Sequence, residues 1–437
     1  MTISAHSFNI ALNAEGFRDS RVPEGVVVDP PPVTGTRDRR FHPFPASDPY
    51  NMPLGVNAWY APLSDPATSQ FAVNRGYINI NNGVSHPVFM PSSADPIHTI
   101  RMDTCHSWYG GQRVESYRAE ENGGLTLFER LQIDAAPSGG EEMAAWSDRH
   151  LHIMIDNELV ELYRFFRGYR DANCNLIGGL GSGLSQAVAL RIVRNRLDRF
   201  SFGVGTTDPL KNRAGTRAWG GSAIAGLIRR HEVDTAAPYI PHALAIIIRY
   251  RNTASTGVGS QIGRENQGDP SSPLYGVRMM FPAGEIDRFN YTGANGACRM
   301  GMRFALPPSC TDAWINENAP KLSSSVTLHG VTYAANSPNP WQVALARAAR
   351  DYGIIVADSG EPPVNVMSGE VGIPTYIENL MTQNEICKWM FPHMRRVAAQ
   401  GPVHNPSESL WQTWRDAGQG WGGGAPRVPF SAPLTLL

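Results

Sequence analysis

The sequence lacks long apolar runs, and it has almost no excess of charge of either sign. Its longest apolar stretches, such as Ala243 to Ile248, are far shorter than the roughly 20 residues that a membrane-spanning helix needs. The 437 residues carry a formal net charge of −1, so the chain has no general basic field that would hold a polyanion. These two absences argue against membrane insertion and against nucleic acid as a partner.

Paired cysteine motifs are also missing. The five cysteines are odd in number, widely spread and never in a CxxC pair: Cys105, Cys174, Cys298, Cys310 and Cys387. This spacing argues against a disulfide framework and against a zinc ribbon. The first residues contain no basic segment followed by an apolar one, so they indicate no secretory signal. We therefore expect a chain that is made in a reducing cytoplasm.

Charged residues are scarce, whereas glycine and proline are abundant. Charged residues make up 18% of the chain, below the roughly 25% of ordinary soluble domains, and there are 43 glycines and 34 prolines. The hydrophobic content of 42% is enough to build a core. This composition favours short strands joined by turns over long solvated helices.

The chain divides into four predicted regions. Residues 1–65 are rich in proline and aromatic residues and are predicted to form an extended arm that docks across a surface. A β-sandwich body is predicted over 66–336, a helix-containing region packed on it over 337–418, and an extended tail over 419–437. Arm and tail have no core of their own, so we expect them to pack on the body or on neighbouring subunits of a homo-oligomer.

Strand signals fill the predicted body. Short apolar stretches alternate with glycine, proline, asparagine and aspartate, and several show the period of half-buried strands. The predicted strands are Phe71–Ile80, Arg113–Tyr117, Leu125–Ile133, His150–Ile155, Leu159–Phe166, Gln186–Val193, Ala243–Tyr250, Val277–Phe281, Met302–Leu306 and Val326–Tyr333. Ten strands with irregular loops favour a mainly β fold, a β-sandwich or jelly roll, over an α/β sheet.

Helix signals come late in the sequence. Asn339 followed by Pro340 is typical of an N-cap and a first helical residue, and Gly353 marks the end of that helix. The apolar residues 354–356 then predict a strand.

Two further helices are predicted. Thr375 with Glu378 is a capping-box pattern for a helix that reaches Met390. A third helix begins at Ser407, where the spacing of Trp411 and Trp414 indicates a packing face.

An ordered set of segments between about residues 146 and 360 resembles a known family. The segments are Ser147–His152, Glu158–Tyr163, Gly215–Gly220, Leu227–Arg229, Ile240–Ala245 and Ala344–Gly360. Together they resemble a poorly characterised family of β-rich, jelly-roll-like proteins found among secreted bacterial carbohydrate-associated proteins and among phage proteins. The resemblance implies a jelly-roll-like fold with a sugar-facing cleft, and it implies no established activity.

His150 and His152 are the candidate metal ligands. They are two residues apart in an apolar stretch, so their side chains share one face of a strand. Such a pair binds a metal when a third ligand arrives from elsewhere, for instance His242 or Asp148. The alternative is ordinary hydrogen bonding at a sheet surface. The pair alone does not lead us to predict a metal or another cofactor.

Acid–base chemistry has several candidate residues. Glycoside cleavage uses two carboxyl groups about 5–5.5 Å or 6.5–9.5 Å apart, and the candidates are Asp148, Glu158, Glu161 and Asp358. Polysaccharide elimination is the other option, with a constellation of His150, His242, Tyr163 and Arg217. For an enzyme we single out His150, Glu161 and His242 as the catalytic set. The structural alternative is a solvated strand edge for Glu158 and Glu161 and a turn for Asp358.

Aromatic residues in glycine-rich stretches are candidates for glycan binding. Flat rings exposed in loops stack on sugars, and the candidates are Trp108, Tyr109, Arg217 and Trp219. The alternative is that these rings anchor loops or subunit contacts. The glycine-rich stretches 178–183 and 220–224 lack the endings of a phosphate loop and of a nucleophile elbow.

Two functional hypotheses result. The first is a non-enzymatic, structural phage virion protein of the tail or adsorption apparatus, synthesised in the host cytoplasm. Its arms would join copies of the chain and other virion proteins, and its sandwich loops would bind a host surface glycan. The second is a carbohydrate-active enzyme, a glycoside hydrolase or polysaccharide lyase, with a jelly-roll cleft. A sugar-binding module without turnover lies between the two.

Overall fold

The structure is a computed structural model, and it describes the chain between residues 41 and 430 in separate ranges. These ranges are 41–72, 76–79, 86–89, 97–102, 126–130, 150–155, 158–163, 165–178, 186–189, 191–196, 200–202, 215–249, 280–283, 298–360, 365–370, 372–382, 386–398 and 408–430. The predicted strand at 113–117 and the residues Asp148, Trp108 and Tyr109 lie outside them.

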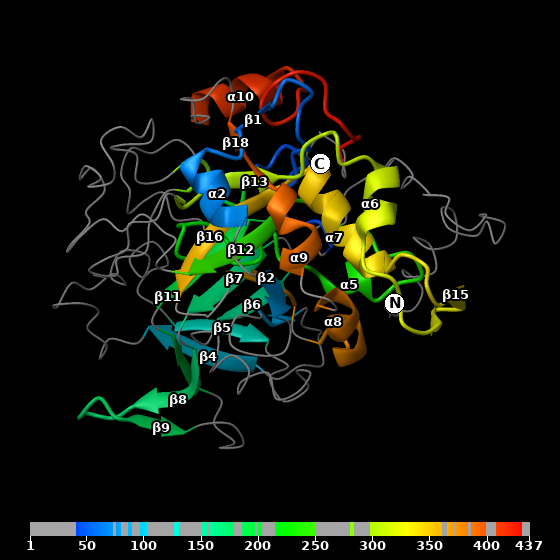
Figure 1. Ribbon diagram of the computed structural model, residues 1–437. Helices are drawn as coiled ribbons and strands as arrows, with labels where there is room; N and C mark the ends of the chain where they lie inside the picture. Colours follow the sequence, from blue (N-terminus) through cyan, green and yellow to red (C-terminus); the bar gives the residue numbers. More distant parts are fainter. Residues whose placement is uncertain are drawn as a thin grey trace, which may run out of the picture.

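A mixed seven-stranded sheet forms the centre of the described fold (Figure 1). Its strands, in spatial order, are β1 (Trp59–Tyr60), β18 (Arg395–Ala398), β13 (Arg303–Ala305), β16 (Ile354–Gly360), β12 (Leu244–Arg249), β17 (Asn365–Ser368) and β2 (Gly76–Asn79). The central pair β12–β16 is parallel, and residues 244–248 and 354–357 are all buried. Unbroken apolar runs suit such strands because both faces of the sheet are covered.

Two smaller sheets lie on one side of the central sheet. The four-stranded sheet has the order β11 (Arg191–Arg196), β7 (Glu158–Tyr163), β6 (Leu151–Ile155) and β3 (Val88–Phe89). The five-stranded sheet has the order β5 (Thr126–Arg130), β4 (Ile97–Met102), β10 (Gln186–Ala189), β8 (Phe166–Arg170) and β9 (Leu176–Gly178). Figure 1 shows β6 and β7 nearer to the central sheet than β4 and β5.

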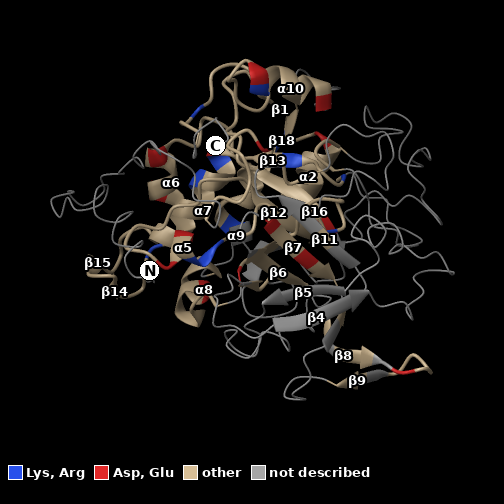
Figure 2. Cartoon of the chain, turned by 180° about the vertical axis from the view of Figure 1, so that it is seen from behind, with Lys and Arg blue, Asp and Glu red and all other residues tan. Residues whose placement is uncertain are grey.

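Helices cover the central sheet and its edges. They are α2 (Pro66–Ala72), α5 (Arg230–Val233), α6 (Asp312–Asn318), α7 (Pro340–Asp351), α8 (Thr375–Thr382), α9 (Ile386–Trp389), the 3₁₀ turn η2 (Phe391–His393) and α10 (Glu408–Asp416). A short hairpin, β14 (Val326–Leu328) with β15 (Val331–Tyr333), completes the described elements. Figure 2 shows basic and acidic residues interspersed over these elements rather than gathered by sign.

The sheet-rich character of the prediction is confirmed, and helices form a larger part of the body than expected. The pairs β12–β16 and β17–β2 are parallel, which departs from the antiparallel pairing of a jelly roll. Adjacent parallel strands need a long crossover connection. Helix α7 lies in the connection between β12 and β16 and packs against β13, so this part of the fold combines helix and sheet.

Local signals placed helix α7 correctly. Asn339 is its N-cap, and the side-chain oxygen accepts hydrogen bonds from the backbone N–H groups of Trp341 and Gln342. Pro340 is the first helical residue, as predicted. Gly353 follows the helix with a φ of +90°, a conformation that favours glycine, and β16 begins at the next residue.

Several predicted elements are corrected. The strand predicted at 326–333 is the hairpin β14–β15, and the strand predicted at 186–193 is divided between β10 and β11 of different sheets. The stretch 71–80 begins inside helix α2 rather than a strand, because Phe71 stacks on Phe304 with ring centroids 3.9 Å apart; β2 starts at Gly76. The helix predicted from Thr375 to Met390 is two helices, α8 and α9. Ser407 lies outside the described residues, but Trp411 and Trp414 of α10 are buried packing residues, as their spacing predicted.

Residues 41–65 and the segment after α10 lie side by side. The Ala243 N–H donates to the Tyr50 carbonyl, which joins the first of these segments to the central strands. The Trp421 N–H donates to the Pro53 carbonyl, and Leu54 forms a parallel bridge with Trp421. Residues 1–40 and 431–437 of the predicted arm and tail lie outside the described ranges.

The cysteines in the described ranges differ in their bonding state. Cys298 and Cys310 are free and buried, whereas Cys174 is disulfide-bonded, a pairing that the sequence spacing did not indicate. None of the described helices combines the length and the apolar character needed to cross a bilayer.

Candidate functional site

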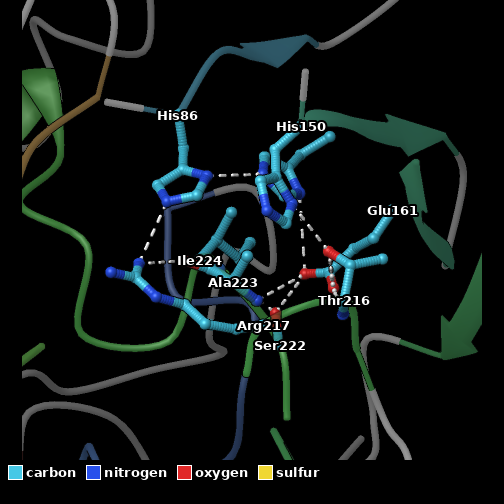
Figure 3. A network of polar contacts seen from close by, with 9 residues as sticks. His86, His150, Glu161, Thr216, Arg217, Ser222, Ala223 and Ile224 are labelled. Carbon is cyan, nitrogen blue, oxygen red and sulfur yellow. Dashed lines mark hydrogen bonds and ion pairs between the residues drawn. The ribbon is translucent and has the colours of Figure 1, made fainter. Parts of the chain in front are cut away.

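Strand register brings three histidines and a glutamate together between the central sheet and the four-stranded sheet (Figure 3). In the β6–β7 pair His152 lies directly opposite Glu161, and in the parallel β3–β6 pair Val88 lies opposite His152. His86, just before β3, forms a bridge with Glu370 next to β17. The rings of His150 and His152 are stacked with centroids 6.0 Å apart, in keeping with the shared strand face that was predicted.

A hydrogen-bond chain runs through the site. An Nη1–H of Arg217 points at Nε2 of His86 at 3.0 Å, and Nδ1 of His86 lies 3.1 Å from Nε2 of His152. On the far side, Nδ1 of His152 faces Oε1 of Glu161 at 3.6 Å.

The chain fixes the tautomer of each ring. An arginine only donates, so Nε2 of His86 must accept and its proton must sit on Nδ1. That proton is then donated to Nε2 of His152, which leaves the His152 proton on Nδ1, facing Glu161. The network is therefore polarised in one direction, from the guanidinium to the carboxyl group.

Glu161 is fully enclosed by hydrogen-bond donors. Its Oε2 accepts from the N–H (2.8 Å) and the hydroxyl (3.3 Å) of Thr216. Its Oε1 accepts from the Ala223 N–H at 3.0 Å and from the Ser222 hydroxyl. The side chain is 0% exposed, and burial raises its pKa to about 7, against the lowering effect of these hydrogen bonds.

The donors to Glu161 come from a tightly closed loop, residues 215–223. A Cβ atom on Gly215 would lie 2.2 Å from the Gly221 carbonyl oxygen, so the two ends of the loop touch through backbone atoms. Only glycine permits this approach. The glycine-rich stretch that did not match a catalytic elbow thus serves to wrap a buried carboxyl group.

Arg217 is buried and held by several partners. Its Nη2 donates to the Ser368 hydroxyl at 3.0 Å, and its Nε lies 3.4 Å from Oδ2 of Asp358. The Asp358 side chain is 24% exposed, more than any other charged partner in this network. The guanidinium therefore lies between an accessible carboxylate and the buried histidines.

His150 and Tyr163 lie at the other side of the cluster. Nδ1 of His150 is 3.1 Å from the Thr216 hydroxyl, and its ring centroid is 4.9 Å from that of Tyr163 and 5.1 Å from that of His86. Burial, with Arg217 nearby, lowers the pKa of His86 well below its usual value and that of His152 to about 3. The His86 and His152 rings are therefore neutral at physiological pH.

The structure unites most of the predicted site residues but not all of them. His150, His152, Glu161, Tyr163, Arg217 and Asp358 belong to one network. His242 does not: its Nε2 is 3.0 Å from Oε1 of Glu232 in a separate buried ion pair. The third histidine is His86, which sequence reasoning missed because the β3–β6 pairing spans 66 residues between the two rings.

The glycan-binding expectation for Arg217 and Trp219 is corrected. Both side chains are only 1% exposed. The Trp219 ring packs against Tyr50, with centroids 5.5 Å apart, and covers Gly221, where a Cβ atom would lie 2.1 Å from it. A buried ring offers no face to a sugar, so Trp219 anchors the closed loop. Trp108 and Tyr109 lie outside the described residues.

A second buried ion-pair network adjoins the site through Glu370. Oε2 of Glu370 lies 2.9 Å from Nε of Arg229, whose own N–H donates to Glu232 at 2.8 Å. Glu232 in turn holds His242, and the pair raises the pKa of His242 and lowers that of Glu232 despite burial.

No protein-family model, curated protein or solved structure matches this chain.

Proposed function

We propose that the histidine cluster is the catalytic centre of an acid–base enzyme of the carbohydrate-active class. The reaction is elimination in a polysaccharide that carries carboxylate groups. The observation behind this proposal is the convergence of His150, Tyr163 and Arg217 on one buried network, next to the neutral imidazoles of His86 and His152. Strongly perturbed titratable groups gathered in one place are more typical of functional sites than of structural ones.

Elimination fits these residues better than glycoside hydrolysis does. Hydrolysis needs two carboxyl groups on either side of the scissile bond. Both oxygens of Glu161 are already engaged by loop donors, and the group is fully buried. Its role is that of a positioning residue for His152 and for the closed loop. Elimination instead needs a base, an acid and a positive charge.

Each requirement has a candidate in the cluster. The unprotonated form of His150 takes the proton from the carbon next to the substrate carboxylate. The electron pair of that C–H bond forms a carbon–carbon double bond as the glycosidic C–O bond breaks. The leaving oxygen receives the Tyr163 hydroxyl proton, and the buried Arg217 charge stabilises the developing anion through the network, without touching the sugar. Return of the proton from His150 to Tyr163 restores the site, and no water is consumed.

Substrate approach is expected from the side of His150 and Tyr163, which are 6% and 8% exposed, whereas His152 and Glu161 are fully buried. His86, His152 and Glu161 then lie behind the reacting groups and hold the orientation of Arg217 and of the loop. Such a supporting layer is what keeps catalytic side chains in productive geometry.

The test uses the full chain and a panel of uronate-containing polysaccharides. Elimination creates a double bond conjugated to the carboxylate, which is followed by ultraviolet absorbance, together with new reducing ends. We expect His150→Asn and Tyr163→Phe to lower the rate by about 10²–10⁴-fold. The matched control is Tyr169→Phe on β8, because Tyr169 is 40% exposed and outside the cluster.

Three results would contradict the proposal. New reducing ends without the absorbance would indicate hydrolysis instead of elimination. Full activity of both site variants would show that the cluster takes no part in catalysis. Inactivity of the folded wild-type chain on every member of the panel would contradict the proposed reaction.

The virion role and the jelly-roll arrangement stay predictions from the sequence. The virion role depends largely on the predicted arm (1–65) and tail (419–437), of which residues 1–40 and 431–437 lie outside the described ranges. Deletion of residues 1–40 tests it, since the deletion spares the buried residues from Phe44 onwards. Unchanged assembly on gel filtration would contradict the predicted role of the arm.

A further inference from the structure

We infer that His86, His150 and His152 form a binding site for one divalent transition-metal ion of the zinc class. We also infer that such an ion inhibits the proposed enzyme. Metal binding follows from the geometry alone, whereas inhibition rests on the proposed function.

The separations of the ring nitrogens fit a metal with little adjustment. Two nitrogens bound to one tetrahedral zinc at about 2.05 Å lie about 3.3 Å apart. Nδ1 of His86 and Nε2 of His152 are already 3.1 Å apart. The ligand atoms of all three histidines lie within 4.8 Å of one another, so the third ring needs to move by no more than about 1.5 Å.

The outer contacts of His150 and His152 are those of metal-bound histidines. A ligating histidine commonly donates its second N–H to a carboxylate or another oxygen, which sets its tautomer and orientation. Nδ1 of His152 faces Glu161, and Nδ1 of His150 faces the Thr216 hydroxyl, which itself lies 3.3 Å from the same carboxyl group. With these contacts kept, His152 and His150 coordinate through Nε2.

The chemistry of the donors selects the class of ion. Three neutral imidazoles suit zinc, copper, nickel and cobalt, whereas magnesium and calcium prefer oxygen ligands. All three histidines are buried, so the bound ion would be shielded from bulk water. Three protein ligands leave a fourth position for water or another small ligand.

Arg217 opposes this binding, which provides a sharp test. Its guanidinium donates to Nε2 of His86 at 3.0 Å, so a positive charge already lies beside one of the rings. Coordination through Nδ1 also moves the His86 proton to Nε2, where it faces the Arg217 N–H donor that this nitrogen otherwise accepts from. Removal of the Arg217 charge should therefore strengthen metal binding, whereas a purely structural cluster would gain nothing from it.

Inhibition follows from competition for one lone pair. The nitrogen electron pair with which His150 takes a proton is the one it gives to the ion. Coordination therefore removes the proposed base without removing any residue.

The experiment titrates chelator-treated full-length protein with Zn²⁺ by calorimetry and measures metal retained after gel filtration. We expect one ion per chain. His86→Gln and His152→Gln should weaken binding by about 100-fold or more, because each removes a ligand and not only a supporting contact. Arg217→Gln should tighten it by about tenfold, which corresponds to a charge interaction of about 1.4 kcal/mol. The matched control is His329→Gln, since His329 is exposed and paired with Asp234.

A second measurement does not depend on variants. Co²⁺ added to the wild-type chain should give the intense visible absorption of a tetrahedral nitrogen site, and Zn²⁺ should abolish it. A folded wild-type chain that binds neither ion, or a folded His86→Gln variant with unchanged affinity, would overturn the metal site.

The turnover assay separates this inference from the proposed function. Zinc binding at the histidines with no turnover on any substrate would contradict the proposed enzyme and support the metal site. If one equivalent of bound zinc leaves turnover unchanged, the inferred inhibition is contradicted.

Discussion

Two buried regions of the described structure, the β12–β16 pair and the histidine cluster, have opposite compositions. The β12–β16 pair carries aliphatic side chains such as Ile246 and Ile355. By contrast, the region where β6 and β7 meet the loop 215–223 holds His152, Glu161 and Arg217. Apolar burial stabilises a fold in proportion to the area removed from water. Burial of charged groups carries a large desolvation cost and often adds no net stability. The polar region therefore depends on its hydrogen bonds and ion pairs rather than on buried apolar area.

The largest effect is expected from Glu161→Ala. This change leaves the Thr216 and Ala223 N–H groups and the Ser222 hydroxyl without their acceptor in a closed interior. We expect a loss of about 3–5 kcal/mol in the free energy of unfolding, measured by urea denaturation. Glu161→Gln keeps the shape and part of the hydrogen bonding and should cost clearly less. Equal losses for the two variants would show that the donors do not depend on this group.

The apolar region should respond somewhat less strongly. Ile246→Ala removes buried methyl groups between covered faces of the sheet, and we expect a loss of about 2–5 kcal/mol in the same measurement. Ile246→Val should cost about 0.5–1.5 kcal/mol. Neither change touches the histidine cluster, so per-molecule turnover and Zn²⁺ affinity of the folded fraction should not change. A specific loss of either would mean that the two regions are coupled.

A smaller loss is expected at the start of α7. Asn339→Ala removes the oxygen that accepts from the Trp341 and Gln342 N–H groups. N-cap truncations typically cost about 0.5–2 kcal/mol. Asn339→Asp keeps an acceptor and serves as the matched variant. A loss as large with aspartate as with alanine would assign the effect to the other contacts of this side chain.

The smallest effect concerns pH and the ion pair beside the polar region. Glu232 raises the pKa of His242, so the stability from this histidine is complete below its unfolded value and is lost as pH rises through its folded value. The pKa of Glu232 is lowered, so its contribution is present above its unfolded value and is lost as pH falls through the folded value.

Thermal melting across the pH range tests this pair. His242→Gln should flatten the alkaline side of the wild-type profile above the ordinary histidine pKa, near 6.5. His329→Gln is the exposed control and should leave that side in place. A wild-type profile with no decline there would contradict the assignment.

Sequence signals were sufficient where the determining contacts are local. The Asn339-Pro340 start, the glycine after α7 and the apolar run of β12 all act within a few residues, and each was predicted. The shared face of His150 and His152 is equally local. Helix α2 was missed because Phe71 pairs with a ring more than 200 residues away.

The site itself depends on pairings that no local pattern encodes. His86 reaches His152 through the β3–β6 pairing, and the closed loop reaches Glu161 across 55 residues and more. Nothing around His86 distinguishes it from a surface histidine next to a proline. The same reasoning assigned His242 to the cluster, although a glutamate ten residues earlier binds it.

The pairing of residues 53–54 with Trp421 has a consequence for biosynthesis. The early segment cannot complete its hydrogen bonds until about 370 further residues have left the ribosome, because Trp421 and Arg427 supply its partners and Trp411 holds Ser47. Contacts of such sequence separation form late and slow folding. A nascent chain interrupted before α10 leaves the backbone of residues 53–57 without its partners, so incomplete synthesis leaves unpaired backbone that chaperones or proteases can recognise.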